Sequence, residues 1–369
     1  MSDLIVQCVK VDDVFPHDNA DRLEIAKVEG WYCVIGKGQF KKGDKAVYIP
    51  IDSVLPDDLI AKIFANSKIQ LKTGRVKTIK IRGSISQGLL TSFEVLQIPE
   101  CKLGTDLKDV LEITKYEPKP PFYQKHCGKG KRTWKRRYNH PEFKRYTNIQ
   151  NYKNNIRIFI EGELVSITEK IHGSNMRASI LKRDKKGFFK EMIFKIKTLF
   201  GYGKEYEFCY GSHNVQLSVG HATYYGGDPY FEMVLKYDLQ NKLGKNETIY
   251  GEVYGASIQK NYMYGCNIGE RKAIFFDLRR NDAFLSPKEF EKFCKEKDLP
   301  MSAILFEGTF NEEEIKKLAT GDSVFCPEQK IIEGIVIKAQ TECGHPKIGR
   351  KVLKLINDEY LLKDNSDFH

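Results

Sequence analysis

The sequence predicts an α+β protein of two domains, a small N-terminal β-barrel followed by a larger domain that mixes strands and helices. A chain of 369 residues is too long for one ordinary hydrophobic core. Residues 5–96 hold short apolar runs between turn signals, whereas amphipathic helical patterns begin only after about residue 139. We therefore expect a barrel at residues 1–100, a connecting segment at 101–139 and an α+β domain at 140–369.

The composition, with 41% hydrophobic and 30% charged residues, is typical of a soluble globular protein. No run of about 18 apolar residues occurs and no basic region precedes an apolar stretch at the start, so neither a membrane span nor a signal peptide is predicted. The nine cysteines form no Cys-x-x-Cys pair, which favours reduced thiols and an intracellular, reducing compartment, either cytoplasm or nucleus. The net charge of +11 favours a polyanionic partner.

The barrel is predicted from five short apolar runs, at residues 5–6, 26–28, 32–35, 46–49 and 78–81. Turn signals such as Lys42-Gly43-Asp44 and Arg82-Gly83-Ser84 separate them, as expected for short strands of a small barrel.

Four segments of this region resemble the OB-fold tRNA-binding modules attached to some aminoacyl-tRNA synthetases: Phe15–Leu23, Lys42–Asp44, Ser53–Pro56 and Ile81–Leu89. OB barrels commonly bind oligonucleotides through aromatic rings and cations on one face. The resemblance gives these candidate contacts: His17, Arg22, Trp31, Tyr32, Lys37 and Arg82. The alternative is that Asn19, Asp21 and Gly83 only shape turns and that Trp31 only fills the barrel.

The connecting region is strongly basic. Between Lys115 and Lys153 there are twelve Lys and Arg residues against two Glu, so nearly the whole net charge lies in about a tenth of the chain. Aromatic residues such as Trp134 and Tyr146 stand between the cations and would allow stacking on bases as well as phosphate contacts. A solvated linker is the alternative, but disordered linkers carry few aromatic residues. RNA contact is therefore the favoured interpretation.

The second domain is predicted to contain strands at about 157–168 and 248–254. Residues 286–294 predict an amphipathic helix with a serine cap and a proline at the first helical position, and residues 311–318 predict another. Both helices are expected to be scaffold.

The first candidate for a catalytic residue is Lys170, in Glu169-Lys170-Ile171-His172-Gly173-Ser174-Asn175 at the end of a strand-like run. A free lysine, with a pKa near ~10.4, is almost entirely protonated at neutral pH and is then no nucleophile. A nucleophilic lysine needs cationic neighbours, a metal or desolvation to lower its pKa. Gly173 would let the backbone approach a bound phosphate or sugar. The Lys-x-x-Gly spacing alone proves little, because it starts at Lys27, Lys80 and Lys125 as well.

Only the spacing at Lys170 is followed by an ordered series of carboxylates, aromatic residues and lysines on short apolar strands. The series is Ile249–Gly255, Ala273–Leu278, Ile332–Lys338 and Lys351–Leu355. It resembles the motifs of the covalent nucleotidyltransferases, which include ATP-dependent RNA ligases, DNA ligases and mRNA capping enzymes. At the positions of His172 and Asn175 the motif resembles that of the RNA ligases. DNA ligases and capping enzymes usually carry Asp-Gly followed by Arg there. An OB module placed before the transferase domain resembles the nick-sealing RNA ligases.

The resemblance implies a role for each matching residue. Lys170 would form a covalent lysyl-AMP, Asn175 would hold a phosphate, and Phe276 would stack on adenine with Asp277 as a polar or metal-water contact. Glu252 and Glu333 would hold Mg²⁺ or Mn²⁺ through waters, with Glu252 also near the ribose. Lys338 and Lys354 would contact the α-phosphate and lower the pKa of Lys170. The remaining residues implied to line the nucleotide site are Glu169, Ile171, Gly173, His213 and Lys351.

Two positions depart from the family pattern. Many relatives carry Lys-x-Lys in the last motif, but Val352 stands two residues before Lys354, and a regular strand would turn Lys351 to the opposite face. His213 stands where some relatives have Arg.

The expected function is ATP-dependent joining of RNA 3′-OH and 5′-phosphate ends, at nicks in duplexes, with no membrane and no obligate protein partner. One alternative is an RNA-binding protein with a vestigial transferase domain. Another is a DNA ligase or a capping-type nucleotidyltransferase.

Overall fold

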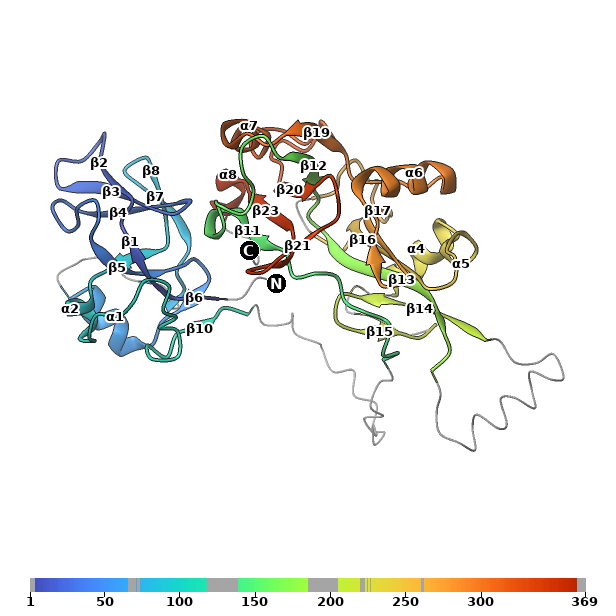
Figure 1. The fold of residues 1–369 in the computed structure, drawn as a ribbon, viewed down its shortest axis with the longest axis horizontal. Coiled ribbons are helices and arrows are strands. Elements are labelled where there is room, and N and C mark those ends of the chain that lie inside the picture. The colour runs from blue at the N-terminus through green and yellow to red at the C-terminus, as the bar shows by residue number, and fades with distance from the viewer. Residues whose placement is uncertain are drawn as a thin grey trace.

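The computed structural model describes residues 4–65, 71, 74–117, 139–184, 205–219, 223, 225, 227–259 and 262–363. These residues form two units, which lie side by side in Figure 1. Within these ranges, no helix is both long enough and apolar enough to cross a membrane.

The N-terminal module, residues 4–117, consists of short strands in small antiparallel sheets. Two three-stranded sheets contain β1 (Gln7–Lys10), β5 (Lys45–Ile49) and β9 (Leu89–Thr91), and β2 (Asp13–Pro16), β3 (Leu23–Val28) and β4 (Trp31–Gly36). Two pairs complete the module: β7 (Thr78–Ile81) with β8 (Ser84–Gln87), and β6 (Ser53–Val54) with β10 (Thr114–Lys115). The helices α1 (Asp57–Ile63) and α2 (Phe93–Leu96) are short. The predicted apolar runs fall within these strands, except that Ile5 and Val6 precede β1.

The packing favours a boundary of this module later than residue 100. Thr114 pairs with Val54, and Leu107, Leu111 and Ile113 belong to the same buried cluster as Val47. We therefore propose that the module extends to about residue 117. Most of the basic segment, residues 118–138, lies outside the described residues, so its predicted RNA contacts stay a prediction.

The second unit contains two larger sheets. The first sheet has the order β11 (Gln150–Asn151), β23 (Val352–Ile356), β20 (Gly334–Ala339), β12 (Leu164–Lys170) and β19 (Ile304–Thr309). The second has the order β15 (Gln216–Leu217), β14 (Tyr206–Ser212), β13 (Ser174–Lys182), β16 (Glu247–Gly255), β17 (Arg271–Arg280) and β18 (Ala283–Phe284). A small hairpin, β21 (Gly344–His345) and β22 (Gly349–Arg350), precedes β23.

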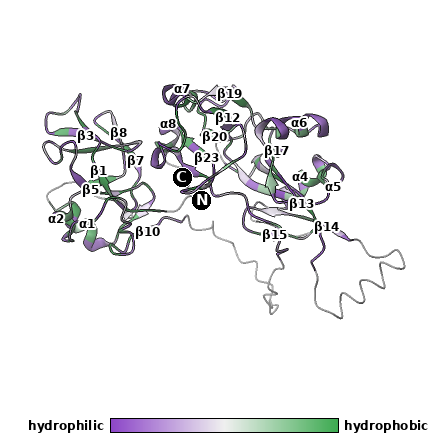
Figure 2. Ribbon diagram, in the orientation of Figure 1, coloured by the Kyte–Doolittle hydropathy of each residue, from purple (hydrophilic) through white to green (hydrophobic). Residues whose placement is uncertain are grey.

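Helices cover one face of each sheet. Helix α7 (Glu312–Leu318) places Ile315 in the core under the first sheet, together with Val165 and Ile337. Helices α4 (Pro229–Lys236), α5 (Leu239–Lys242) and α6 (Pro287–Lys297) pack on the second sheet, as Figure 1 shows. In Figure 2, α6 is coloured mainly as hydrophilic with hydrophobic positions between, as expected for a helix with one buried face. A polar site can therefore form on the opposite faces of the two sheets.

The sequence predictions for this unit are largely confirmed. Helix α6 begins with the predicted serine cap at Ser286, which forms a full capping box with Glu289, and Asn311 caps α7. Strand β16 covers the predicted residues 248–254. The strand predicted at 157–168 is wrong in its first half, because a turn at Gly162, with φ of +85°, delays the start of β12 to Leu164.

The two units are joined by a continuous core and by polar contacts. Trp31 and Cys33 of the N-terminal module share a buried cluster with Ile171 and Tyr360 of the second unit. Several polar contacts converge on a 3₁₀ turn, Tyr152–Asn154. Lys153 Nζ donates to Gln87 Oε1 at 2.8 Å and to Asp358 Oδ1 at 2.6 Å, and Trp31 Nε1 donates to Asn154 Oδ1 at 2.5 Å.

Candidate active site

Lys170 is the last residue of β12, and its ammonium group contacts a buried carboxylate. Lys170 Nζ donates to Glu333 Oε1 at 2.5 Å. The Lys170 side chain keeps 26% of its surface exposed, whereas that of Glu333 keeps 4%. The Lys170 side chain is therefore partly accessible to solvent, although its partner is not. We call the polar region between the two sheets, around Lys170, Glu252, Glu333 and Lys354, the cleft.

Strand register explains which lysines share the cleft face of the first sheet. Lys170 lies opposite Gly334, Val336 lies opposite Lys354, and Lys338 lies opposite Val352. Because side chains alternate along strands, Lys170, Lys338 and Lys354 all lie on one face, away from the core that contains Ile335 and Leu353.

The second sheet supplies the facing polar residues. Asn175 on β13 lies opposite Glu252 on β16, and the backbone amide of His213 donates to the Asn175 carbonyl at 3.1 Å. Position 173 requires glycine for a packing reason, in addition to the predicted access for a phosphate or sugar. A Cβ there would lie 2.2 Å from the Val253 carbonyl oxygen. Glycine at this position lets the motif cross tightly over β16 and places Lys170 near Glu252.

Charges in this cleft shift three pKa values. Burial alone would lower the pKa of Lys170, but the carboxylates of Glu333 and Glu252 outweigh it and raise the pKa. Burial also raises the pKa of Glu252 to about 8, although Lys170 opposes the shift. Burial and the nearby Lys170 lower the pKa of Lys354 to about 8. The expectation that neighbouring cations depress the pKa of Lys170 is therefore wrong for this arrangement, because the two carboxylates have the stronger effect.

A buried charge network lies at the other end of the cleft. Asp277 Oδ2 accepts hydrogen bonds from Lys338 Nζ at 2.9 Å, Arg350 Nη1 at 2.6 Å and Tyr146 OH at 2.7 Å. Burial opposes ionisation of Asp277, but Lys338 and Arg350 outweigh it and hold its pKa below the ordinary value. Asp277 is only 1% exposed and is held by these three partners, and its predicted contact with a nucleotide or a hydrated metal stays a prediction.

Phe276 is held by the same network. Lys338 Nζ donates to the Phe276 carbonyl at 2.7 Å, and the Tyr146 ring packs edge-on against the Phe276 ring with centroids 4.9 Å apart. Sequence reasoning missed Arg350 and Tyr146 as partners of this site. Arg350 is next to Lys351, but the tight hairpin β21–β22 that turns it inward has no strong sequence signal.

The side chains of three residues predicted to line the nucleotide site make their contacts elsewhere in the structure. Glu169 is 1% exposed, and its carboxylate accepts from Ser323 Oγ at 2.5 Å and from the amides of Val324 and Phe325 at 2.9 Å, so it caps a loop. The side chain of Ile171 is buried in the core between the two units. Lys351 donates to Glu163 Oε1 at 2.6 Å, away from the cleft, because alternation along the strand turns it to the face opposite Lys354.

His213 has a neutral ring, and the candidates of the N-terminal module divide into two buried and four exposed residues. Burial is the main cause that lowers the pKa of His213 to about 4, with Arg177 and Arg145 among the cations that add to it, so this ring is neutral at physiological pH. In the N-terminal module, His17 and Trp31 are buried, and His17 Nε2 lies 3.0 Å from the Ile81 carbonyl oxygen. Arg22, Tyr32, Lys37 and Arg82 are exposed. The structure thus gives His17 and Trp31 packing roles and leaves the exposed four as candidate RNA contacts.

Comparison with protein families identifies the second unit. A family model described as RNA ligase matches residues 162–356, more than half of the chain. The chain belongs to the RNA ligase family. The match begins just before the strand that carries Lys170 and ends with the strand that carries Lys354.

The N-terminal module of the ligase matches a family model described as an OB-fold domain, over residues 5–93. The predicted fold class, an OB-type barrel followed by an α+β nucleotidyltransferase domain, is thereby confirmed, and the chain is an RNA ligase with an N-terminal OB module. Comparison with curated proteins gave no match.

Solved structures similar to this ligase include several of an RNA ligase from Naegleria gruberi. The structure with PPi has a TM-score of 0.72 at 22% identity, covering 98% of each chain. A variant with AMP and Mn has a TM-score of 0.71 at 22% identity, covering 97% of this chain and 98% of that one. An apo variant has a TM-score of 0.71 at 23% identity, with 97% of each chain covered. At this identity the likeness establishes a shared fold, over almost the whole length of both chains.

Proposed function

We propose that the ligase joins RNA 3′-OH and 5′-phosphate ends, at nicks in duplexes, through a covalent lysyl-AMP on Lys170. The observation that carries the proposal is the position of the Lys170 amine, which is partly exposed, faces Glu252 and Lys354, and contacts Glu333. Such an arrangement suits phosphoryl transfer, which depends on positioning and charge neutralisation more than on acid and base groups.

ATP and Mg²⁺ or Mn²⁺ are the proposed cofactors, supported by the similar Naegleria gruberi RNA ligase structures with ATP or AMP and Mn. Two buried oxygens of the cleft, Glu333 Oε2 and Asn175 Oδ1, have no hydrogen-bond partner within the described part of the chain. Buried acceptors without partners are costly, so they fit a bound cation, its waters or a ligand donor.

The described residues contain no group of three or more His, Cys, Asp or Glu side chains arranged to hold a metal directly. Glu252 and Glu333 would therefore hold a divalent ion mainly through waters. When bound, that ion would offset negative charge on the ATP phosphates. Its charge would also counter the effect of the two carboxylates on Lys170, and would thereby favour the neutral amine.

The proposed reaction has three steps. The Lys170 amine attacks the α-phosphorus of ATP, a P–N bond forms, and pyrophosphate leaves. An oxygen of an RNA 5′-phosphate attacks the same phosphorus, the P–N bond breaks, and the RNA carries the AMP. The RNA 3′-hydroxyl finally attacks the 5′-phosphate and AMP leaves. Lys354 would contact the transferred phosphate, while Lys338 would hold Phe276 against the adenine.

The experiment is incubation with α-labelled ATP and Mg²⁺, followed by sealing assays on nicked and single-stranded RNA. We expect label on the wild-type protein, loss of label in Lys170→Ala, and the fastest sealing at nicks. Lys351→Ala is the matched control, because this lysine pairs with Glu163 on the other face of the sheet. An unlabelled wild-type protein that still binds RNA would favour a vestigial transferase domain, and sealing of DNA 3′-ends alone would favour a DNA ligase.

A further inference from the structure

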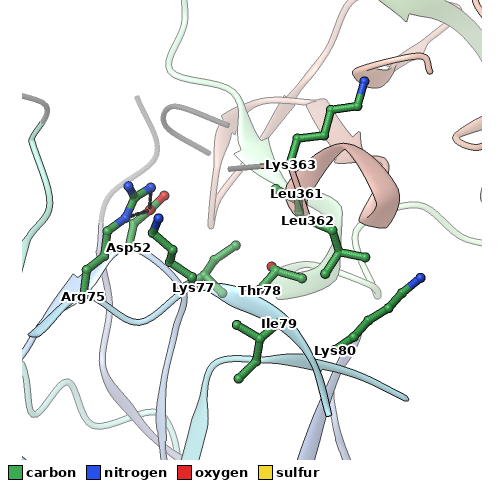
Figure 3. A pocket seen from close by; sticks show the side chains of 10 residues that line it. Asp52, Arg75, Lys77, Thr78, Ile79, Lys80, Leu361, Leu362 and Lys363 are labelled. Carbon is green, nitrogen blue, oxygen red and sulfur yellow. Dashed lines mark hydrogen bonds and ion pairs between the residues drawn. The ribbon is translucent and has the colours of Figure 1, made fainter. Parts of the chain in front are cut away.

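A cavity lies between the OB module and the end of the transferase domain, with a volume of about 420 Å³. One wall is formed by the OB module, including Lys77, Lys80 and the side chains of Asp52 and Arg75. The opposite wall is formed by Leu362 and Lys363, which follow helix α8 (Asp358–Leu361). Figure 3 shows the two walls facing each other. We call this cavity the interdomain groove.

The charge of the interdomain groove is positive. Arg75 Nη2 lies 2.6 Å from Asp52 Oδ1 and the two side chains are less than a tenth exposed, so they neutralise each other. Lys77 and Lys80 are exposed. Among the described residues, no carboxylate lies within 4.0 Å of the ammonium group of Lys77, Lys80 or Lys363. Three unneutralised lysines around a concave surface favour a polyanion.

The interdomain groove is held open by fixed contacts. Lys153 bonds both to Gln87 of the OB module and to Asp358 at the start of α8, and the Trp31 indole bonds to Asn154. Arg75 also stacks on the Tyr116 ring, with its guanidinium carbon 3.8 Å from the ring centroid. Because both walls are fixed to the same turn, the cavity is preformed, which reduces the entropy lost on binding.

The groove adjoins the catalytic cleft. Helix α8, which leads into one wall, carries Tyr360, and the Tyr360 hydroxyl lies 3.0 Å from Nδ1 of His172, two residues after Lys170. Asp52, on the other wall, is close enough to Lys354 to oppose the lowering of its pKa. The walls of the groove are thus in contact with, or close to, residues beside Lys170 and Lys354.

We propose that the interdomain groove binds the phosphodiester backbone of RNA beside the ends that are joined. The volume is at the lower end of the range, roughly 300–1,000 Å³, of small-ligand sites, and so suits a short piece of backbone. This inference rests on the proposed function, because it extends the RNA path of that same reaction.

The test compares Lys77→Ala/Lys80→Ala with a matched pair, Lys10→Ala/Lys41→Ala, which removes two exposed lysines of the OB module outside the groove. Affinity for an RNA duplex with a preadenylylated nick is measured without ATP at several salt concentrations, and the rate of Lys170 adenylylation is measured separately. We expect the groove variant to lose roughly tenfold in RNA affinity. The slope of log affinity against log salt concentration should decrease by about 1 per lysine removed. The loss in RNA affinity should exceed any loss in adenylylation rate by about tenfold.

Equal RNA affinity of the groove variant and the matched control would overturn the proposal. So would a parallel loss of ATP and RNA affinity, because the groove would then belong to the nucleotide site. Failure of the proposed function would look different: the wild-type protein itself would acquire no label from ATP, whereas RNA affinity is measured without it. Thermal unfolding of each variant shows whether it is folded.

Discussion

At the scale of single residues, the cleft combines an amine with two carboxylates of different character. Glu333 bonds directly to Lys170, whereas Glu252 faces it from the other sheet, and burial raises the Glu252 pKa to about 8. A carboxyl group with this pKa is largely protonated at neutral pH, and a bound cation would release the proton. Magnesium affinity should therefore increase with pH up to about 8.

Glu252→Gln tests this shift through stability. The folded pKa of Glu252 lies above its ordinary value of 4.5, so the folded protein holds the proton more tightly than the unfolded chain. Wild-type stability should then fall, relative to Glu252→Gln, as pH increases from about 5 to about 8, because ionisation of the buried group is unfavourable. Thermal unfolding of both proteins across this range measures the difference. A difference in Tm that stays constant with pH would contradict the shift.

At the scale of elements, the hairpin β21–β22 fixes the far end of the cleft through Arg350. Its guanidinium bonds to Asp277 and forms a two-pronged contact with Glu342, at 2.6 Å and 2.7 Å. Asp277 in turn orders Lys338, which bonds to the carbonyl of Phe276. The hairpin thereby positions the ring proposed to stack on adenine.

Arg350→Lys should lower the free energy of unfolding by about 2–4 kcal/mol, because lysine cannot replace the planar fork and leaves the buried Asp277 carboxylate underpaired. Denaturant unfolding measures the loss, and the KM for ATP in adenylylation should increase with it. Arg279→Lys is the control: it alters a pair with the exposed Asp282, and should change stability by less than about 0.5 kcal/mol. If Arg350→Lys proves as stable as Arg279→Lys, the hairpin does not hold the site.

At the scale of the whole molecule, the OB module is a fixed part of the enzyme. Its core continues into the second unit, and Gly30 approaches Lys153 so closely that a Cβ would lie 2.6 Å from the Lys153 Cα. The barrel therefore brings its exposed cations to a fixed position beside the catalytic domain.

Lys153→Ala should weaken this junction, because it leaves Asp358 and Gln87 without a donor that they share. We expect a loss of about 2–4 kcal/mol in the free energy of unfolding and an earlier unfolding of the OB module in calorimetry. Lys292→Ala, which removes a surface pair with Glu296, should have almost no effect. Unchanged unfolding of Lys153→Ala would mean that the junction depends on its apolar core alone.

The sequence allowed much of this to be predicted, because strand periodicity and helix caps are local. Ser286 and Asn311 begin their helices as predicted, and alternation along β23 correctly turned Lys351 away from Lys354. What could not be predicted depended on contacts between distant residues. Glu169 follows the motif pattern but binds a loop more than 150 residues away, and Arg350 acquires its role only when the chain brings it to Asp277. The direction of the Lys170 pKa was missed because it depends on the balance of charges from separate strands.

The most direct test of the central claim is peptide mapping by mass spectrometry after incubation with ATP and Mg²⁺. The account predicts one AMP adduct, on the peptide that contains Lys170. This adduct should disappear when unlabelled RNA with a 5′-phosphate at a nick is added. An adduct on another lysine, or a wild-type protein that stays unmodified while it seals RNA, would contradict it.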